Sequence, residues 1–397
     1  MIIKPSIRSN VFTNAHPIGC KQNVENQINE AKKLTPFKGP KNVLIIGGSS
    51  GYGLASRIAL AYGAGANTIN ISYEAAPKNN RTGSAGWWNN IYFQEAAKEL
   101  PTLHKDFVGD AFSLEMKQEV ADYISKTVKK VDLVIYSLAA GARKDETTGD
   151  LVRSHIKTIG EPATGKTIDI SEKVVKELSV TGATEQEVKD TVFVMGGSDW
   201  RAWIQYLLNQ DLLSEGFKTI SYTYIGGPTT DKIYRGGSLG FAKEDLEQSA
   251  YDMNEMLKER LHGEALISSS KAVVTKASVF IPQMPHYVSC LFEVMMKHHV
   301  HETILEHKFR LFKDMIYGNK RIVDEKNRIR LDHLEMDPKI QKETIALMTS
   351  SDDDTFFELE GTKRFLKEVH QIHGFEFDDI DYDQDVDLEK LSEKAPV

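Results

Sequence analysis

A glycine-rich turn near the start of the chain has the composition of a dinucleotide-phosphate site. It fits the pattern G-x-x-x-G-x-G and comprises Gly47, Gly48, Ser49, Ser50, Gly51, Tyr52 and Gly53. Glycines allow a tight turn whose backbone can approach a pyrophosphate, and a helix beginning there adds unpaired N–H groups and partial positive charge. Ordinary strand-to-helix turns can carry similar glycines. Here the apolar run Val43–Ile46 precedes the turn and an apolar helical pattern follows it, which favours the cofactor interpretation.

An acidic residue at the next predicted strand end bears on the choice of cofactor. Glu74 follows Tyr73, which ends a predicted strand, and lies 21 positions after Gly53. A carboxylate there accepts hydrogen bonds from the adenosine ribose and repels a 2′-phosphate, so we expect NADH to be preferred over NADPH. Lys78 and Arg81 follow in the same loop and would weaken that preference.

Two further strand ends should line the same crevice, because ligands of parallel sheets sit at the carboxyl ends of the strands. Asp110 and Ala111 follow one predicted strand and are expected near the adenine. Leu138 and Ala139 follow another and are expected near the nicotinamide.

A tyrosine and a lysine have the chemistry of a proton-donating pair for a nicotinamide-dependent reductase. A tyrosine serves as the proton donor when a nearby cation lowers its pKa from about 10. The Tyr-x-x-x-Lys spacing of short-chain dehydrogenases has no good candidate after the fourth predicted strand. Tyr234 and Lys243 instead stand in a Tyr-x8-Lys arrangement, and Gly236, Gly237 and Gly240 between them make the segment bendable enough for the two side chains to converge.

Several motifs along the chain together resemble those of the trans-2-enoyl-CoA reductase and type V enoyl-[acyl-carrier-protein] reductase family. The resemblance extends over about residues 1–385. Its landmarks are MIIKPSIRSN, AHPIGC, GGSSGYGLASR, GWWNN, GDAFS, YSLAAGAR, VMGGSDW, YTYIGGP, Tyr234-x8-Lys243 and AVVTKASVFIPQMP. The chain departs from the family at Phe241, where a lysine is usual and a possible phosphate-binding charge is lost, and at Trp88, where a tyrosine is usual.

The resemblance implies a reaction and a set of site residues. The reaction is NADH-dependent reduction of the C2=C3 double bond of a trans-2-enoyl thioester, carried by coenzyme A or by acyl carrier protein, in fatty acid synthesis or short-chain acyl metabolism. By resemblance, Tyr234 is the catalytic tyrosine, Lys243 holds the cofactor ribose and Tyr224 contacts the substrate. The backbone of Val273, Val274 and Thr275 is expected to close on the nicotinamide end.

Three other functions remain open from the residues. A different NADH-dependent reductase or alcohol dehydrogenase could use the same frame, and a catalytically silent NAD-binding module could share the glycine turn. Gly160–Thr167 matches the phosphate loop G-x-x-x-x-G-K-[ST] of NTPases. The residues before it are mixed and those after it alternate like a strand, so we expect a solvated loop there.

The predicted elements that position these residues alternate between apolar strands and helices. This order is typical of an α/β protein with a Rossmann-like, doubly wound parallel sheet and helices on both faces. We expect one large domain, short-chain-dehydrogenase-like, with an extension over 1–40, a core over 41–290 and a helical addition with an acidic tail over 291–397. Within the core, 141–190 is expected to be an irregular excursion and Val273–Phe280 an apolar helix, and the histidines near 298–307 are expected at a solvated helix start.

Composition narrows the cellular setting. The net charge is −8, so the long-range field has the wrong sign for generic binding to nucleic acid. Cys20 and Cys290 are too few for a disulfide framework and show no metal-binding spacing, so we expect no metal and a reducing, cytoplasmic environment. No apolar run is long enough to span a membrane, and the family resemblance suggests a monomer.

Overall fold

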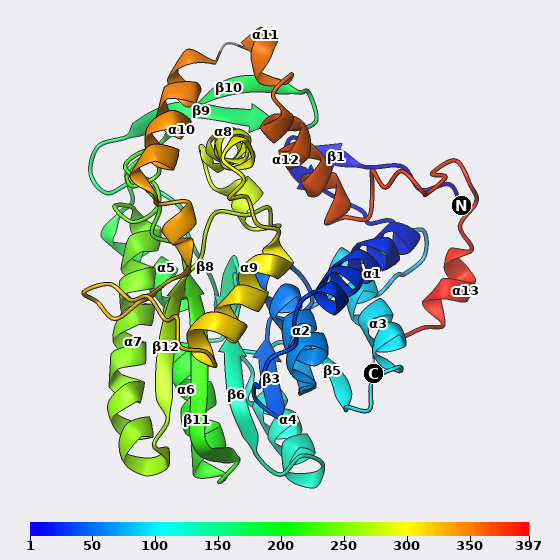
Figure 1. The fold of residues 1–397 in the computed structure, drawn as a ribbon, viewed down its shortest axis with the longest axis vertical. Coiled ribbons are helices and arrows are strands. Elements are labelled where there is room, and N and C mark those ends of the chain that lie inside the picture. Colours follow the sequence, from blue (N-terminus) through cyan, green and yellow to red (C-terminus); the bar gives the residue numbers. More distant parts are fainter. Residues whose placement is uncertain (352, 397) are drawn as a thin grey trace.

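The computed structural model describes residues 1–351 and 353–396, and its centre is a seven-stranded sheet in which all paired strands are parallel (Figure 1). The strand order is β13-β12-β11-β6-β3-β4-β5. The strands are β3 (Asn42–Ile46), β4 (Asn67–Ser72), β5 (His104–Val108), β6 (Val131–Tyr136), β11 (Leu213–Thr223), β12 (Glu264–Ser269) and β13 (Ile329–Arg330). The chain leaves β3 in opposite directions along the sheet, which is the doubly wound arrangement predicted from the sequence, and the crevice for a ligand lies where the order reverses, between β3 and β6.

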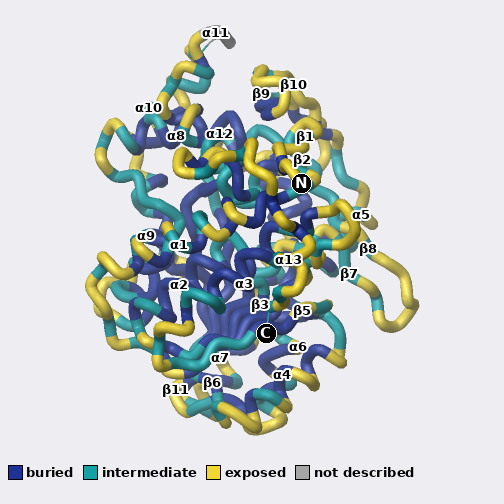
Figure 2. The backbone as a smooth tube through the Cα atoms, turned by 90° about the vertical axis from the view of Figure 1, so that its right-hand side faces the viewer, coloured by how far each residue is buried: buried dark blue, intermediate teal, exposed yellow. Residues whose placement is uncertain are grey.

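The sheet is covered on both faces because its strands present apolar side chains to both. Val43 and Ile45 of β3 pack in one cluster, and Leu44 and Ile46 pack in another. The first cluster includes helices α1 (Pro17–Lys33), α2 (Gly51–Ala64), α3 (Ala85–Ala97) and α9 (Ile304–Arg310). The second includes α4 (Leu114–Lys126), α6 (Ser198–Asn209) and α7 (Ser238–Leu261). Figure 2 shows the strands as the most buried part of the backbone, with exposed segments at the periphery.

A separate layer lies beyond one end of the sheet, at the top of Figure 1. It consists of α8 (Met284–Lys297), α10 (Pro338–Ser350), α11 (Asp353–Phe356), α12 (Glu360–Gln371), β9 (Ala163–Asp169) and β10 (Val174–Val180). Its apolar cluster also contains Tyr224, Tyr234 and Val274, so this layer continues directly into the residues predicted to form the site.

The segment 141–190 contributes no strand to the central sheet, but the expectation that it is irregular is wrong. The segment forms two antiparallel hairpins, β7 (Ala142–Lys144) with β8 (Leu151–Arg153) and β9 with β10, and then enters α5 (Glu185–Met195). The outer strand of the second hairpin, β10, is largely exposed, and its apolar and polar residues do not alternate regularly, which hid the strand pattern. Gly160–Thr167 runs into β9, where Gly165 pairs with Leu178, so the phosphate-loop match does not begin a helix.

The expected helix over Val273–Phe280 is also wrong, because only Ser278–Phe280 forms a single 3-10 turn. The hydroxyl of Ser278 accepts from the Thr275 N–H at 2.9 Å and donates to the Val273 carbonyl at 2.9 Å. Such local side-chain bonds compete with helical hydrogen bonds. The apolar side chains Val273 and Val274 are buried from a loop instead.

The two ends of the chain meet on one side of the molecule (Figure 1). The Met1 ammonium lies 2.7 Å from the Asp385 carboxylate, and Ile3, Phe375 and Val386 form a small buried cluster. Here the N-terminal hairpin of β1 (Ile7–Arg8) and β2 (Val11–Phe12) and the acidic tail with α13 (Leu388–Ser392) complete the fold. No helix in the described part of the chain combines the length and apolar character that a membrane span requires.

Candidate active site

A cavity of about 550 Å³ opens at the carboxyl ends of β3, β6 and β11, where the doubly wound order reverses. It brings together most of the residues predicted from the sequence. Those that line it are Gly47, Ser49, Ser50, Gly51, Tyr52, Tyr73, Glu74, Leu138, Ala139, Tyr224, Tyr234, Lys243, Val273 and Thr275. Segments separated by more than 200 positions therefore meet around one space, as the sequence analysis required.

Five predicted residues do not line this cavity. Gly48 and Gly53 belong to the glycine turn but do not line the cavity, and Val274 is buried in the layer beyond the sheet. Asp110 and Ala111 follow β5. The Asp110 carboxylate accepts from the Phe112 N–H at 2.9 Å, and the Ala111 carbonyl accepts from Trp203. Both therefore belong to the loop at the outer part of the same sheet edge.

The glycine turn can accommodate only glycine at its closest contacts. Gly47 has φ +94°, and a Cβ there would lie 2.4 Å from the Ser137 carbonyl oxygen; a Cβ on Gly53 would lie 2.0 Å from the Gly47 carbonyl oxygen. The turn leads into α2, whose N-cap residue Ser50 makes no side-chain capping bond. The N–H groups of the first helical turn therefore face the cavity without a side-chain cap, as phosphate oxygens require.

Glu74 is oriented by neighbours that the sequence analysis did not identify. The Ser49 hydroxyl donates to one carboxylate oxygen at 2.5 Å, and the Ser84 hydroxyl donates to the other. A Cβ on Gly86, near the start of α3, would lie 1.9 Å from the Glu74 carboxylate. Gly86 thus lets the carboxylate rest against the helix, and the acid is held beside the glycine turn where a ribose would lie.

Tyr234 and Tyr224 pack against each other at the cavity wall. Their rings meet edge to face with centroids 4.8 Å apart, and both side chains are buried. Burial raises the pKa of Tyr234 above its ordinary value, and the nearby Arg235 guanidinium lowers it in part. The phenol of Tyr234 is therefore protonated at neutral pH and able to donate a hydrogen bond.

Lys243 lies in the second turn of α7 and faces the same cavity. Burial lowers the pKa of its ammonium to about 8; Arg235 acts in the same direction and Glu247 opposes it. The cation that affects the pKa of Tyr234 is Arg235, which is paired with Glu247 at 2.7 Å. The sequence analysis assigned that electrostatic effect to Lys243, and it did not identify Arg235.

A buried carboxyl group behind Tyr224 was missed entirely from the sequence. Glu335 accepts from the Tyr224 hydroxyl at 2.9 Å and from the Tyr287 hydroxyl at 2.7 Å through one oxygen. Its other oxygen accepts from the Ala272 N–H at 2.6 Å. Burial raises the pKa of Glu335 to about 7, and the three hydrogen bonds counteract that effect. One side chain thus anchors both Tyr224 and the loop that carries Val273 and Thr275.

His307 also supports this loop, and its burial contradicts the expectation of a solvated helix start for this histidine, whereas His299 is exposed as expected. His307 is fully buried, and its Nε2 accepts from the Lys271 N–H at 3.2 Å. Its Nδ1 lies 3.0 Å from a Glu302 oxygen, so Nδ1 carries the proton. Burial lowers the pKa of His307 to about 3, and the ring is neutral at physiological pH.

Family models match nearly the whole chain. Residues 2–79 match the NAD(P)H binding domain of trans-2-enoyl-CoA reductase, and residues 81–317 match the trans-2-enoyl-CoA reductase catalytic region. Residues 323–386 match a model described as the enoyl reductase FAD binding domain.

Two relatives are similar to this chain over nearly its whole length. A trans-2-enoyl-CoA reductase [NADH] of Clostridium acetobutylicum is 43% identical, with 100% of both chains covered. An enoyl-[acyl-carrier-protein] reductase [NADH] 2 of Photobacterium profundum is also 43% identical, over 99% of each. The crystal structure of the Clostridium acetobutylicum enzyme in complex with NADH superposes with a TM-score of 0.96 over 99% of both chains.

The segment matched by the flavin model does not fit a flavin in this structure. Its glycines are filled by protein backbone: a Cβ on Gly361 would lie 2.3 Å from the Glu293 N, and one on Gly374 would lie 2.3 Å from the His16 carbonyl oxygen. Its buried acids are already engaged, Glu335 as described and Asp332 by Ser269 at 2.8 Å. The segment packs against α8 and supports the cavity from behind.

Proposed function

The chain belongs to the trans-2-enoyl-CoA reductase family and is an NADH-dependent reductase of the C2=C3 double bond of trans-2-enoyl thioesters, and we propose that Tyr234 and Lys243 carry this reaction. The observation that supports the assignment is the shared cavity. Tyr234, Tyr224 and Lys243 line the same 550 Å³ space as the glycine turn at the start of α2. A thioester in that space would lie between a buried phenol and a phosphate-binding turn.

Cofactor binding is the task of the glycine turn, Glu74 and Lys243. The uncapped N-terminus of α2 receives the pyrophosphate, and the oriented Glu74 carboxylate accepts hydrogen bonds from the adenosine ribose. Lys243 holds the nicotinamide ribose, and the backbone of Val273 and Thr275 closes on the nicotinamide end. NADH bound in this way supplies a hydride to the β-carbon of the substrate.

Tyr234 acts on the charge that the reaction creates. When the β-carbon receives hydride, negative charge develops on the thioester oxygen, and a preorganised donor in a water-poor site stabilises that charge. The raised pKa of Tyr234 keeps its phenol protonated for this purpose. Tyr224, held by Glu335, is the second aromatic wall beside the thioester. Protonation at the α-carbon then completes the saturated product.

A steady-state comparison of substrates tests the function. With NADH, crotonyl-CoA is expected to be reduced efficiently, whereas simple ketones are expected to give no measurable turnover. NADPH should support a lower kcat/KM than NADH because the Glu74 carboxylate repels a 2′-phosphate. Turnover of ketones at rates comparable to crotonyl-CoA would instead indicate an alcohol dehydrogenase.

We also propose that the enzyme works as a cytoplasmic monomer in fatty acid or short-chain acyl metabolism. Cys20 and Cys290 are buried free thiols, as is usual in a reducing compartment. The apolar cluster on one face of the sheet includes residues from Ala15 to Leu388, which supports one folding unit over the whole chain. Light scattering after size exclusion is expected to give the mass of one chain; the mass of a dimer would contradict the proposal.

A further inference from the structure

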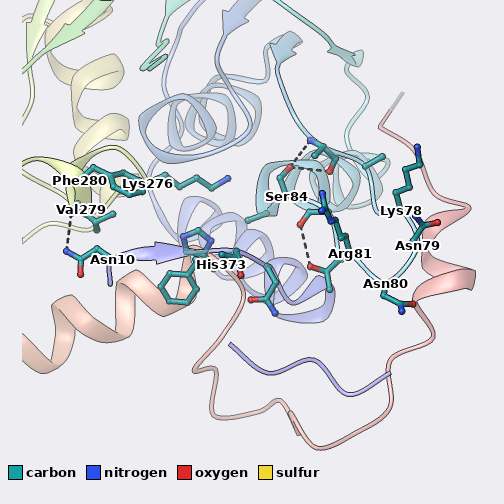
Figure 3. Close-up of a pocket in the computed structure, with 18 residues that line it drawn as sticks. Asn10, Lys78, Asn79, Asn80, Arg81, Ser84, Lys276, Val279, Phe280 and His373 are labelled. Carbon is teal, nitrogen blue, oxygen red and sulfur yellow. Dashed lines mark hydrogen bonds between the residues drawn. The ribbon is translucent and has the colours of Figure 1, made fainter. Parts of the chain in front are cut away.

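A second cavity, of about 930 Å³, lies on the other side of the segment that follows Glu74. Its walls are formed by residues 10–14 after β1, by the loop 75–85 and by the segment 276–280 (Figure 3). The two cavities adjoin, since Lys276 lines both and the lining of one ends at Glu74 where the other begins at Ala75. A ligand longer than the first cavity can therefore extend into the second past Lys276.

The side chains that line this second cavity carry positive charge, whereas the molecule as a whole carries net negative charge. Lys78, Arg81 and Lys276 line it, and its lining contains no aspartate or glutamate, although the chain has a net charge of −8. Among the described residues none of these three cations forms an ion pair. In Figure 3 the Lys276 side chain extends from the Phe280 side toward the loop that carries Arg81. Three unpaired cations around one hollow attract a polyanion such as a nucleotide phosphate.

Aromatic side chains from residues 10–14 and from the segment 276–280 also line this cavity. Phe280 is 52% exposed, although large apolar side chains are usually buried, and it lies at the cavity. The Phe12 ring stacks on His373 with centroids 4.2 Å apart, and burial, followed by the Lys276 charge, lowers the pKa of His373 to about 3, so this ring is neutral. Exposed aromatic faces bind bases by stacking. Cations from the loop 75–85 and from Lys276, together with the aromatic rings of Phe12 and Phe280, match the two halves of a nucleotide.

We propose that this cavity binds the adenosine 3′,5′-bisphosphate end of an enoyl-CoA substrate. The inference rests on the proposed function, which requires a thioester beside Tyr234. Coenzyme A has its phosphates and adenine at the far end of a flexible pantetheine arm from the thioester. With the thioester in the first cavity, the arm passes Lys276 and the phosphates lie among Lys78, Arg81 and Lys276. A concave hollow lined by cations and aromatic rings favours this small nucleotide over the convex surface of a carrier protein.

Kinetics with full and truncated substrates test the site. The double variant K78Q/R81Q removes two cations, and the turn is retained because its backbone bonds between these residues (3.1 Å in each direction) do not involve the side chains. We expect its KM for crotonyl-CoA to rise about tenfold, its kcat to stay within about twofold, and its KM for crotonyl-pantetheine to be unchanged. Lys258→Gln, exposed near the far end of α7 from Lys243, is the matched control and should leave both KM values unchanged.

Direct binding of adenosine 3′,5′-bisphosphate to the wild type saturated with NADH completes the test and needs no turnover. We expect binding that is lost in K78Q/R81Q, weakened by salt and competitive with crotonyl-CoA. Competition with NADH would overturn the proposal, because the bisphosphate would then occupy the dinucleotide site. A KM that rises equally for both thioesters, or only for an enoyl-carrier-protein substrate, would also overturn it. Failure of the wild type to reduce crotonyl-CoA while the bisphosphate binds as expected would contradict the proposed function and leave the nucleotide site supported.

Discussion

Glu335 receives three hydrogen bonds from donors that belong to three different segments of the chain. Tyr224 directly follows β11, Ala272 follows β12 and Tyr287 lies in α8. Because a buried acceptor with three donors fixes all of them, Glu335 is a positioning residue for Tyr224 and for the loop at the nicotinamide end. Its ionisation couples this network to pH.

The pH dependence follows from the raised pKa of Glu335. Its folded-state pKa is about 7 and its ordinary value is 4.5, so between these pH values the folded protein holds a proton that the unfolded chain has lost. The contribution of this group to stability is therefore greatest below about pH 4.5 and decreases as pH rises toward 7, by on the order of 3 kcal/mol. Denaturation of wild type and Glu335→Gln at several pH values measures this difference.

Glu335→Gln is expected to lose this part of the pH dependence. It should also lower stability, because the glutamine amide presents N–H groups where the Ala272 N–H needs an acceptor, at a cost of about 1–3 kcal/mol. An unchanged difference between the two proteins from pH 4.5 to 7 would show that the group is ionised in the folded state over that range.

Site residues were predictable from the sequence where they belong to one local motif. The glycine turn and Glu74 lie within 30 positions of one another, and spacing alone indicated that they share a site. Tyr224 and Glu335 are 111 positions apart and no motif joins them. The sequence also did not distinguish Arg235 from Lys243 as the cation acting on Tyr234, because that depends on how the bendable segment before α7 folds.

At the scale of elements, the apolar strands were predicted well because the burial of both sheet faces makes them continuous apolar runs. The apolar run Val43–Ile46 lies within β3, which begins one residue earlier at Asn42. The segment Val273–Phe280 has a similar apolar content and was predicted as a helix, yet local bonds of Ser278 hold it as a loop. Apolar composition did not show that this segment is a loop, because the hydrogen bonds that decide its conformation join the Ser278 hydroxyl to the backbone.

Ser278→Ala tests the importance of that loop. The change removes an acceptor for the Thr275 N–H and a donor to the Val273 carbonyl, so we expect a loss of about 1–2 kcal/mol in unfolding free energy. The KM for NADH should rise severalfold, because the loop closes on the nicotinamide end. The exposed Ser125→Ala in α4 is the matched control. An unchanged KM for NADH in Ser278→Ala would remove the loop from the cofactor site.

At the scale of the whole molecule, the layer above the sheet and the sheet itself share the site. Tyr224 directly follows strand β11 of the sheet and packs in the cluster of α8 and α12, and Glu335 comes from the segment that follows β13. The sequence indicated the doubly wound core from its alternating elements. It did not indicate that the C-terminal addition reaches back to the cavity, because that contact depends on tertiary packing.

This shared packing predicts cooperative unfolding. Trp88 belongs to the cluster on one face of the sheet, and Trp200 and Trp203 belong to the other. Tryptophan fluorescence and circular dichroism are expected to give one coincident urea transition, because neither face can lose its strands alone. Two separated transitions would contradict this prediction and show that the chain does not unfold as one unit.

Turnover by Tyr234→Phe tests the central claim most directly. The variant keeps the ring that packs on Tyr224 and removes only the hydroxyl, so we expect kcat/KM for crotonyl-CoA to fall by about 10²–10³ while the Kd for NADH stays within about twofold. Tyr206→Phe, in α6 on the opposite side of the sheet from the glycine turn's helix, is the control and should behave as wild type. Wild-type turnover in Tyr234→Phe would contradict the assignment of this phenol as the donor to the thioester oxygen.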